Sequence, residues 1–223
     1  MRIECSAVLF DLDGVLVDST AYIERQWREW AAGRGLDPAP FLRVCHGRRA
    51  LETIRLAAPR LNAEAEVARF REQVVESDPV LDAVPGAAAL VRSLPPGTWA
   101  VVTSGSATSA RRRLCAAGLP LPAVLVSADD VRHGKPSPEG YLRAAERLGV
   151  PASACVVIED APPGVEAARA GGMVVIALVG TYSPDQLAAA DYRIDSLEAL
   201  GVLTCVSASI VRAAPPRIAL TSS

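Results

Sequence analysis

The chain has 223 residues, of which 50% are hydrophobic, 22% are charged and 4% are aromatic. Its 23 Lys and Arg residues against 25 Asp and Glu residues give a formal net charge of −2 at pH 7. High hydrophobicity with a low net charge excludes disorder as the main state of the chain, and the balanced charge leaves no strongly basic footprint for nucleic acid. At roughly 150 residues per domain, the length allows one or two domains.

The sequence gives no sign of a membrane or secreted protein. No apolar run reaches the ~18 residues that a membrane span requires, and the first residues lack the apolar stretch of a secretory signal. Free, mostly buried thiols in a cytoplasmic protein are the simplest interpretation of an odd number of widely spaced cysteines. These are Cys5, Cys45, Cys115, Cys155 and Cys205.

Short apolar runs alternate with alanine-rich segments of helical spacing along most of the chain. This alternation predicts an α/β fold, a Rossmann-like parallel sheet sandwiched by helices. The expected strands are residues 6–10, 98–103, 123–127, 154–159 and 173–178. The expected helices between them are residues 86–94, 106–117, 137–148 and 162–171.

One long stretch breaks the alternation, because only helical patterns occur between residue 19 and about residue 84. We therefore predict a small α-helical domain inserted after the first strand. The expected division is a core domain of residues 1–17 and 83–203, a helical domain of residues 18–82, and a loose C-terminal tail of residues 204–223.

Two carboxylates, Asp11 and Asp13, leave the end of the first expected strand. Gly14 then permits a sharp turn. Ligands of open parallel sheets bind beyond the carboxyl ends of the strands, and side-chain alternation lets both acids point the same way. Such a pair can hold a hard cation such as Mg²⁺. Solvated acids at the end of a strand are the alternative.

Two further strand ends carry groups suited to an anion. Ser104 and Gly105 follow the second strand, where a hydroxyl and the N–H groups of a helix start can form an anion pocket. Lys135 precedes Pro136, whose ring stiffens the loop, and its ammonium is a compact charge suited to phosphate. An ordinary helix cap and a solvated lysine are the alternatives.

A second acidic pair, Glu159 and Asp160, ends the strand of residues 154–159. Adjacent carboxylates repel one another unless a cation or hydrogen-bond donors compensate them; an Asp helix cap followed by prolines is the alternative. All four sets of residues follow strands of one predicted parallel sheet, so they can face one crevice. Phosphoryl transfer requires groups that position and stabilise charge, and these residues supply them: acids, a hydroxyl, N–H groups and a lysine.

Four segments resemble, in order, the four motifs of the haloacid dehalogenase-like superfamily. The helical insertion resembles the cap of its beta-phosphoglucomutase-like and sugar-phosphatase branch, which includes 2-deoxyglucose-6-phosphatase-like proteins. The resemblance covers residues 6 to about 200. The motif segments are residues 11–19 (DLDGVLVDS), 103–105 (TSG), 134–136 (GKP) and 159–164 (EDAPPG).

The resemblance implies a role for each motif residue. Asp11 would be the nucleophile that becomes an aspartyl phosphate. Asp13 would be the general acid for the leaving alkoxide and then the base for water. Ser104 and the Gly105 N–H would bind phosphoryl oxygens, and Lys135 would offset charge between nucleophile and phosphoryl group.

The resemblance also implies a Mg²⁺ cofactor. Its ligands would be the Asp11 carboxylate, the Asp13 backbone carbonyl and Asp160, with Glu159 beside or behind it.

Hydrolysis of sugar or polyol phosphates is the expected reaction. Asp13 argues against dehalogenation, because the dehalogenases lack an acid at that position. The mutases of this branch place a histidine five residues after the position of Asp18, and here that residue is Ile23. A sugar-phosphate mutase and a non-catalytic sugar-phosphate-binding protein stay open as alternatives. A receiver-like phosphoaspartate domain is disfavoured, because it has no helical insertion after its first strand.

The expected specificity lies in the cap. Residues 45–49 (CHGRR) resemble the cap loop of deoxysugar- and polyol-phosphate phosphatases, so Arg49 and His46 are candidate substrate contacts; solvated side chains are the alternative. We expect Tyr22, Trp27 and Trp30 to pack inside the cap, and Asp18 and Ser19 to form a hinge and helix cap. The expected partner is a small phosphorylated molecule, with no nucleic acid or membrane, bound by a monomer or weak homodimer.

Overall fold

The computed structural model describes residues 2–76, 80–205 and 217–222. Six parallel strands form the main sheet, in the order β4-β3-β2-β5-β6-β7. They are β2 (Ala7–Phe10), β3 (Trp99–Val102), β4 (Val124–Val126), β5 (Cys155–Glu159), β6 (Val174–Leu178) and β7 (Tyr192–Ile194). The predicted α/β fold is confirmed, and β7 is a strand that the sequence patterns did not predict.

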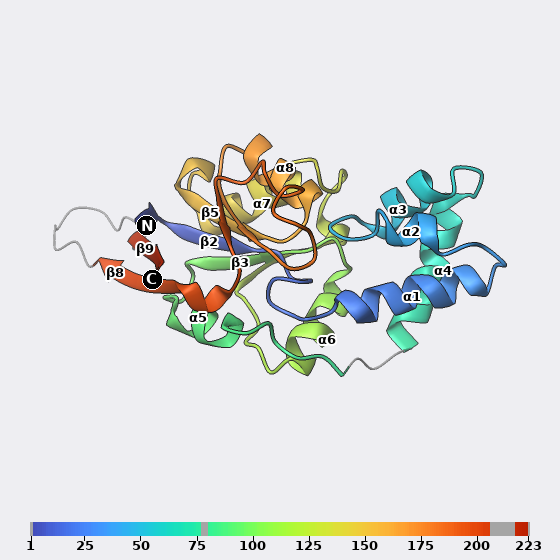
Figure 1. Ribbon diagram of the computed structural model, residues 1–223. Helices are drawn as coiled ribbons and strands as arrows, with labels where there is room; N and C mark the ends of the chain where they lie inside the picture. The colour runs from blue at the N-terminus through green and yellow to red at the C-terminus, as the bar shows by residue number, and fades with distance from the viewer. Residues whose placement is uncertain (1, 77–79, 206–216, 223) are drawn as a thin grey trace.

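Helices cover both faces of this sheet. Neighbouring residues on a strand point to opposite faces, so its apolar strands have side chains to bury on each face. Phe10 belongs to one apolar cluster and Leu9 to the other. Helices α5 (Ala87–Ser93) and α6 (Ala107–Ala116) cover the face of Phe10, and α7 (Glu139–Leu148) and α8 (Pro162–Ala170) cover the face of Leu9 (Figure 1). Short 3₁₀ turns occupy Ala128–Asp130, Ala152–Ala154 and Leu197–Ala199.

Four helices occur between β2 and α5, and we call them the cap helices. They lie beside the carboxyl ends of the strands (Figure 1). Trp27 and Trp30 are buried in their own apolar cluster, as predicted, whereas Tyr22 packs against the cluster of the main sheet. The cap helices are α1 (Thr20–Ala32), α2 (Ala39–Leu42), α3 (Ala50–Ala57) and α4 (Ala63–Glu76). The exact domain boundaries given above stay a prediction.

Two backbone contacts close the insertion at its base. Val17 bridges Ala83 in antiparallel fashion, and the Asp18 N–H donates to the Asp82 carbonyl at 2.9 Å. The two chain segments that connect the cap helices to the sheet therefore lie side by side.

The prediction of a loose tail is wrong for the last described residues. Strand β9 (Arg217–Ser222) pairs antiparallel with β1 (Arg2–Cys5) and with β8 (Leu200–Cys205) in a second, three-stranded sheet. Leu220 is fully buried there, which offsets the entropic cost of ordering the segment. Residues 206–216 lie outside the described part of the chain.

Candidate active site

The loop after β2 carries Asp11 and Asp13 in one compact turn. The Asp13 N–H donates to Asp11 Oδ2 at 2.9 Å, which fixes the direction of the Asp11 carboxylate. Gly14 has a φ of 85°, and a Cβ there would lie 2.1 Å from Asp160 Oδ2. A glycine is therefore required for the first and fourth motif segments to approach this closely.

Lys135 joins three of the motif segments. Its ammonium contacts Asp11 Oδ1, lies 2.6 Å from Glu159 Oε1, and donates to the Val102 carbonyl at 3.3 Å. Lys135 is 5% exposed and Glu159 is fully buried. The Tyr141 hydroxyl adds a hydrogen bond of 2.9 Å to Glu159 Oε1. Three strand ends thus meet at one buried ammonium.

Glu159 lies behind the motif loops. While Oε1 contacts Lys135 and Tyr141, Oε2 accepts the N–H groups of Asp160 at 2.9 Å and Ala161 at 3.0 Å. A Cβ on Gly164 would lie 1.5 Å from Glu159 Oε1, so α8 starts directly against this carboxylate. The contacts of Glu159 are those of a group that anchors Lys135 and the start of α8.

Buried charges dominate the electrostatics of the site. Burial raises the pKa of Asp11 to about 7, against the opposing effect of the Lys135 ammonium. Burial also raises the pKa of Asp160 well above its usual range, and the Glu159 and Asp11 carboxylates add to the rise. Burial opposes the charged form of Lys135, but Asp11 and Glu159 outweigh it and raise its pKa. The three carboxyl groups outnumber the Lys135 ammonium, and this imbalance favours the binding of a further cation at the site.

Ser104 and Gly105 follow β3, as the sequence predicts. The Ser104 hydroxyl donates to the Gly47 carbonyl of the cap loop at 2.9 Å, and the Gly105 N–H donates to Thr103 Oγ1 at 3.0 Å. Helix α6 begins just beyond them, with the Ser106 side chain as its cap. A hydroxyl and a helix start therefore lie at the strand end that meets the cap.

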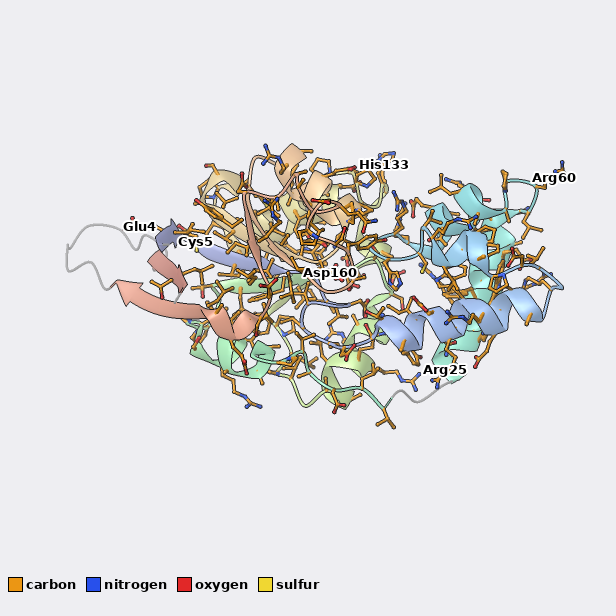
Figure 2. The ribbon with its side chains drawn as sticks, in the orientation of Figure 1. Glu4, Cys5, Arg25, Arg60, His133 and Asp160 are labelled. Carbon is orange, nitrogen blue, oxygen red and sulfur yellow. The ribbon has the colours of Figure 1, made fainter. Side chains whose placement is uncertain are left out.

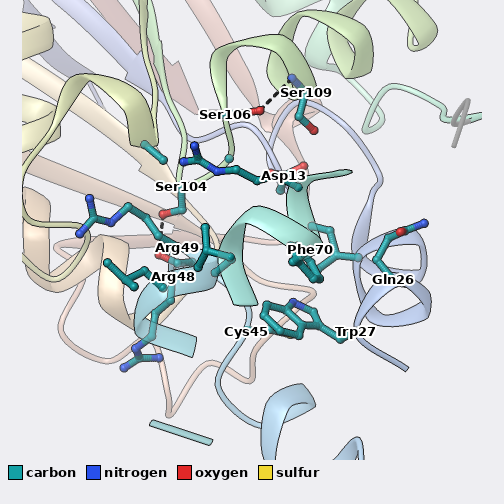
Figure 3. Close-up of a pocket in the computed structure, with 18 of the residues that line it drawn as sticks. Asp13, Gln26, Trp27, Cys45, Arg48, Arg49, Phe70, Ser104, Ser106 and Ser109 are labelled. Atoms are coloured by element: carbon teal, nitrogen blue, oxygen red, sulfur yellow. Dashed lines mark hydrogen bonds between the residues drawn. The ribbon is translucent and has the colours of Figure 1, made fainter. Parts of the chain in front are cut away.

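A cavity of about 330 Å³ separates the motif loops from the cap helices. Asp11, Asp13 and Ser104 line it from the sheet domain, whereas Lys135 and Asp160 are buried and do not line it. Figure 3 shows Trp27 and Phe70 next to one another on the cap side of the cavity. Figure 2 shows Asp160 between the sheet and the cap helices.

The structure brings both predicted cap residues to the cavity wall. The Arg49 guanidinium is bound to Glu52 and donates to the carbonyls of Val131 at 3.1 Å and Arg132 at 3.0 Å, so it ties the cap loop to the sheet domain. His46 Nε2 lies 3.5 Å from Glu24 Oε1. Substrate contact by either residue stays a prediction.

Sequence reasoning missed Arg113 of α6. Its Nη1 lies 2.6 Å from both carboxylate oxygens of Asp13, and Arg113 is 7% exposed. The sequence Arg111-Arg112-Arg113 carries no signal that singles out one of the three, except that position 113 falls on the buried face of the helix.

Ser19 is the N-cap residue of α1, as predicted, and its carbonyl accepts the Ile23 N–H at 2.8 Å, but its side chain makes no capping hydrogen bond. Its hydroxyl instead donates to Asp13 Oδ1 at 2.6 Å. A hydrogen bond to a carboxylate is charge-assisted and strong, and this partner draws the hydroxyl into the site.

A parallel sheet with buried acids, a hydroxyl and one ammonium at its carboxyl edge, under a helical cap, defines an enzyme of phosphoryl transfer. A family model described as "haloacid dehalogenase-like hydrolase" matches residues 5–172. The chain belongs to this family and is a phosphoric monoester hydrolase.

Known proteins similar to the chain cover nearly all of it. Hexitol phosphatase A of Escherichia coli (strain K12) is 41% identical over 89% of this chain and 94% of its own length. The 2-deoxyglucose-6-phosphate phosphatase 2 of Saccharomyces cerevisiae is 32% identical over 87% of this chain and 89% of its own. The crystal structure of CbbY from Rhodobacter sphaeroides in complex with phosphate has a TM-score of 0.71 at 27% identity, over 86% of this chain and 95% of that one.

None of the helices in the described part of the chain is long and apolar enough to cross a bilayer.

Proposed function

We propose that the protein hydrolyses phosphate monoesters of small sugars or polyols through an aspartyl phosphate on Asp11. The observation that carries this proposal is the buried contact between Asp11 and Lys135 beside a cavity of about 330 Å³. A carboxylate attacks an anionic phosphorus only where cations offset the repulsion. The hexitol and deoxyglucose phosphate phosphatases among the similar proteins support the substrate class.

Attack by Asp11 forms a bond between its carboxylate oxygen and phosphorus, and the bond from phosphorus to the substrate alkoxide breaks. Asp13 gives its proton to the departing alkoxide. Water then attacks the phosphorus of the aspartyl phosphate and loses a proton to Asp13, which frees Asp11 and phosphate. Ser104 binds a phosphoryl oxygen once its hydroxyl turns from the Gly47 carbonyl.

The residues present fit a bound Mg²⁺. Burial raises the pKa of both Asp11 and Asp160, and the Glu159 carboxylate adds to the rise in each. Mg²⁺ prefers such oxygen ligands. The described residues form no cluster of three or more His, Cys, Asp or Glu side chains suited to a metal. Mg²⁺ needs no such cluster, because one or two carboxylates, waters and a substrate phosphate usually hold it.

In this proposal Asp11, Asp160 and the Asp13 carbonyl hold Mg²⁺, and Glu159 stays behind them as the anchor of Lys135. When bound, the ion supplies positive charge between the nucleophile and the phosphoryl group.

Ile23 favours hydrolysis over phosphoryl transfer between sugars. The mutases of this branch have a histidine at this position, whereas the Ile23 side chain lines the cavity and offers no proton donor or acceptor. The phosphorylated substrate is the expected partner. A cytoplasmic location and a monomeric or weakly dimeric state stay predictions.

The test is phosphate release from a panel of monoesters by purified protein with Mg²⁺. The panel contains hexitol, hexose, deoxyhexose and glycerol phosphates, together with p-nitrophenyl phosphate. We expect turnover with a preference for a sugar or polyol ester, and none with Asp11→Asn. Absence of turnover on every ester, or an Asp11→Asn protein as active as wild type, would remove the proposal.

A further inference from the structure

Arg113 and Asp13 form a partly buried ion pair across 100 residues of sequence. Arg113 Nη1 lies 2.6 Å from each Asp13 oxygen, and the Asp13 side chain is only 19% exposed. Charge-assisted hydrogen bonds of this length are strong in a site shielded from water. Arg113 therefore fixes the orientation of the Asp13 carboxylate.

Two residues at the start of α1 complete the surroundings of this pair. The Ser19 hydroxyl donates to Asp13 Oδ1 at 2.6 Å. The Arg113 guanidinium carbon lies 5.5 Å from the centre of the Tyr22 ring. Among the described residues, no acceptor binds the buried Nε of Arg113. The guanidinium thus contacts Asp13 and the Tyr22 ring of α1.

We propose that Arg113 is the positioning residue that aims the Asp13 carboxyl group at the leaving-group oxygen of the substrate. This inference rests on the proposed role of Asp13 as proton donor. Asp13 and Arg113 line the same cavity, so the carboxyl group reaches the substrate while Arg113 holds it from one side.

The geometry accommodates the proton transfer. When one Asp13 oxygen carries the proton, it gives up its contact with Nη1, and the other oxygen keeps its own. The protonated oxygen is then free to turn toward the alkoxide, while the second contact prevents the side chain from swinging away. A small displacement of a proton donor lowers the rate strongly, because a general acid must lie within hydrogen-bond distance of the leaving-group oxygen.

A direct role in substrate binding predicts different kinetics. If Arg113 bound a substituent of the substrate, its removal would mainly raise KM. If it acts through Asp13, its removal lowers kcat on esters whose leaving group needs a proton. It spares kcat/KM on esters whose leaving group needs none, because kcat/KM covers the steps up to departure of the leaving group and not the later attack of water, which Asp13 also assists. Alkyl phosphates have poor leaving groups and p-nitrophenyl phosphate has a good one, so the two esters separate these roles.

The experiment compares Arg113→Met and Arg113→Lys with wild type on the best alkyl ester of the panel and on p-nitrophenyl phosphate. Arg111→Met is the matched control, because Arg111 lies on the same helix but is exposed. We expect kcat on the alkyl ester to fall at least about tenfold in Arg113→Met, as part of the ~10²–10⁴-fold that general acids contribute, with KM little changed. On the aryl ester kcat/KM should fall less than about threefold.

Arg113→Lys keeps the charge and loses the fixed geometry, so it should show the same selective loss to a smaller extent. This variant also decides the question if Arg113→Met does not fold. In an Asp13→Asn background, Arg113→Met should cause no further loss on the alkyl ester, because two residues that act as one unit are not additive.

An equal loss of kcat/KM on both esters, a change in KM alone, or full additivity with Asp13→Asn would overturn the inference. Failure of the proposed function has a different signature, because wild type would then turn over neither ester.

Discussion

The hydroxyl of Ser104 donates a hydrogen bond of 2.9 Å to the carbonyl of Gly47, so the end of β3 is joined to the cap loop. Gly47 has a φ of 75°, and a Cβ there would lie 2.8 Å from the Ala161 Cβ. The cap loop therefore touches the second and fourth motif segments at a single glycine. This contact holds the cap loop against the sheet domain beside the cavity.

Gly47→Ala should lower kcat/KM by about tenfold, because the methyl group pushes the cap loop off the motif segments by a distance that phosphoryl positioning does not tolerate. Gly35→Ala is the matched control. Gly35 also has a positive φ, 65°, but a Cβ there would meet nothing within 4 Å. Both variants carry the ~1–2 kcal/mol cost of a left-handed alanine. Equal kinetic effects in Gly47→Ala and Gly35→Ala would show that the contact of the cap loop with the motif segments at Gly47 is unimportant for catalysis.

Lys135 is the only lysine in the sequence, and every other residue among the 23 Lys and Arg is an arginine. A compact ammonium fits between the Asp11 and Glu159 carboxylates, whereas a planar guanidinium does not. Lys135→Arg should therefore lose activity by at least about a hundredfold despite its unchanged charge.

Lys135→Met should in addition lower the free energy of unfolding by about 3–5 kcal/mol, because it leaves buried carboxylates without their cation. Urea unfolding measures this, with Arg111→Met as a control for the loss of an exposed cation. A Lys135→Arg protein with near wild-type activity would contradict the account of this residue.

Magnesium should raise the melting temperature of the wild-type protein in proportion to its binding to the folded state. Asp160→Asn should abolish this shift. In EDTA, at neutral pH, the same variant should melt at or above the wild-type temperature, because it removes a buried carboxylate that Asp11 and Glu159 repel. Asp185→Asn, an exposed acid, should keep the full magnesium shift. A shift that survives in Asp160→Asn would place the ion elsewhere.

The cysteines should differ sharply in reactivity. Burial raises the pKa of Cys5 and Cys45 to about 12 and that of Cys155 to about 11, whereas Cys115 is exposed. Because the thiolate is the reactive species, Ellman's reagent at pH 8 should titrate Cys115 alone in a folded Cys205→Ser protein. The other three should react only with denaturant. Rapid reaction of more than one thiol in the native protein would contradict the burial.

The sequence predicted those parts of the site whose positions follow from strand order. Asp11, Ser104 and Glu159 each stand at the end of an apolar run, and parallel strands bring such ends to one edge of a sheet. Arg113 could not be found this way, because its contact with Asp13 depends on how α6 packs, which no local pattern specifies. The hydrogen bonds from Arg49 to the Val131 and Arg132 carbonyls could not be predicted for the same reason.

Strand β7 was missed because Tyr192 and Arg193 are exposed, so this three-residue edge strand lacks an apolar run. The segment of β9 follows two prolines and ends in Thr221 and Ser222, which favoured a loose tail. Its antiparallel pairing with β1, at the other end of the chain, has no local sequence signal.

The most direct test of the account is chemical trapping of the intermediate. Purified protein is mixed with its best substrate and Mg²⁺, quenched during turnover, reduced with borohydride and mapped by mass spectrometry. An aspartyl phosphate is reduced to homoserine, and we predict homoserine at position 11 in the wild type, and none without substrate. Phosphate release with Asp11 unmodified under every quench, together with activity in Asp11→Asn, would contradict the central claim.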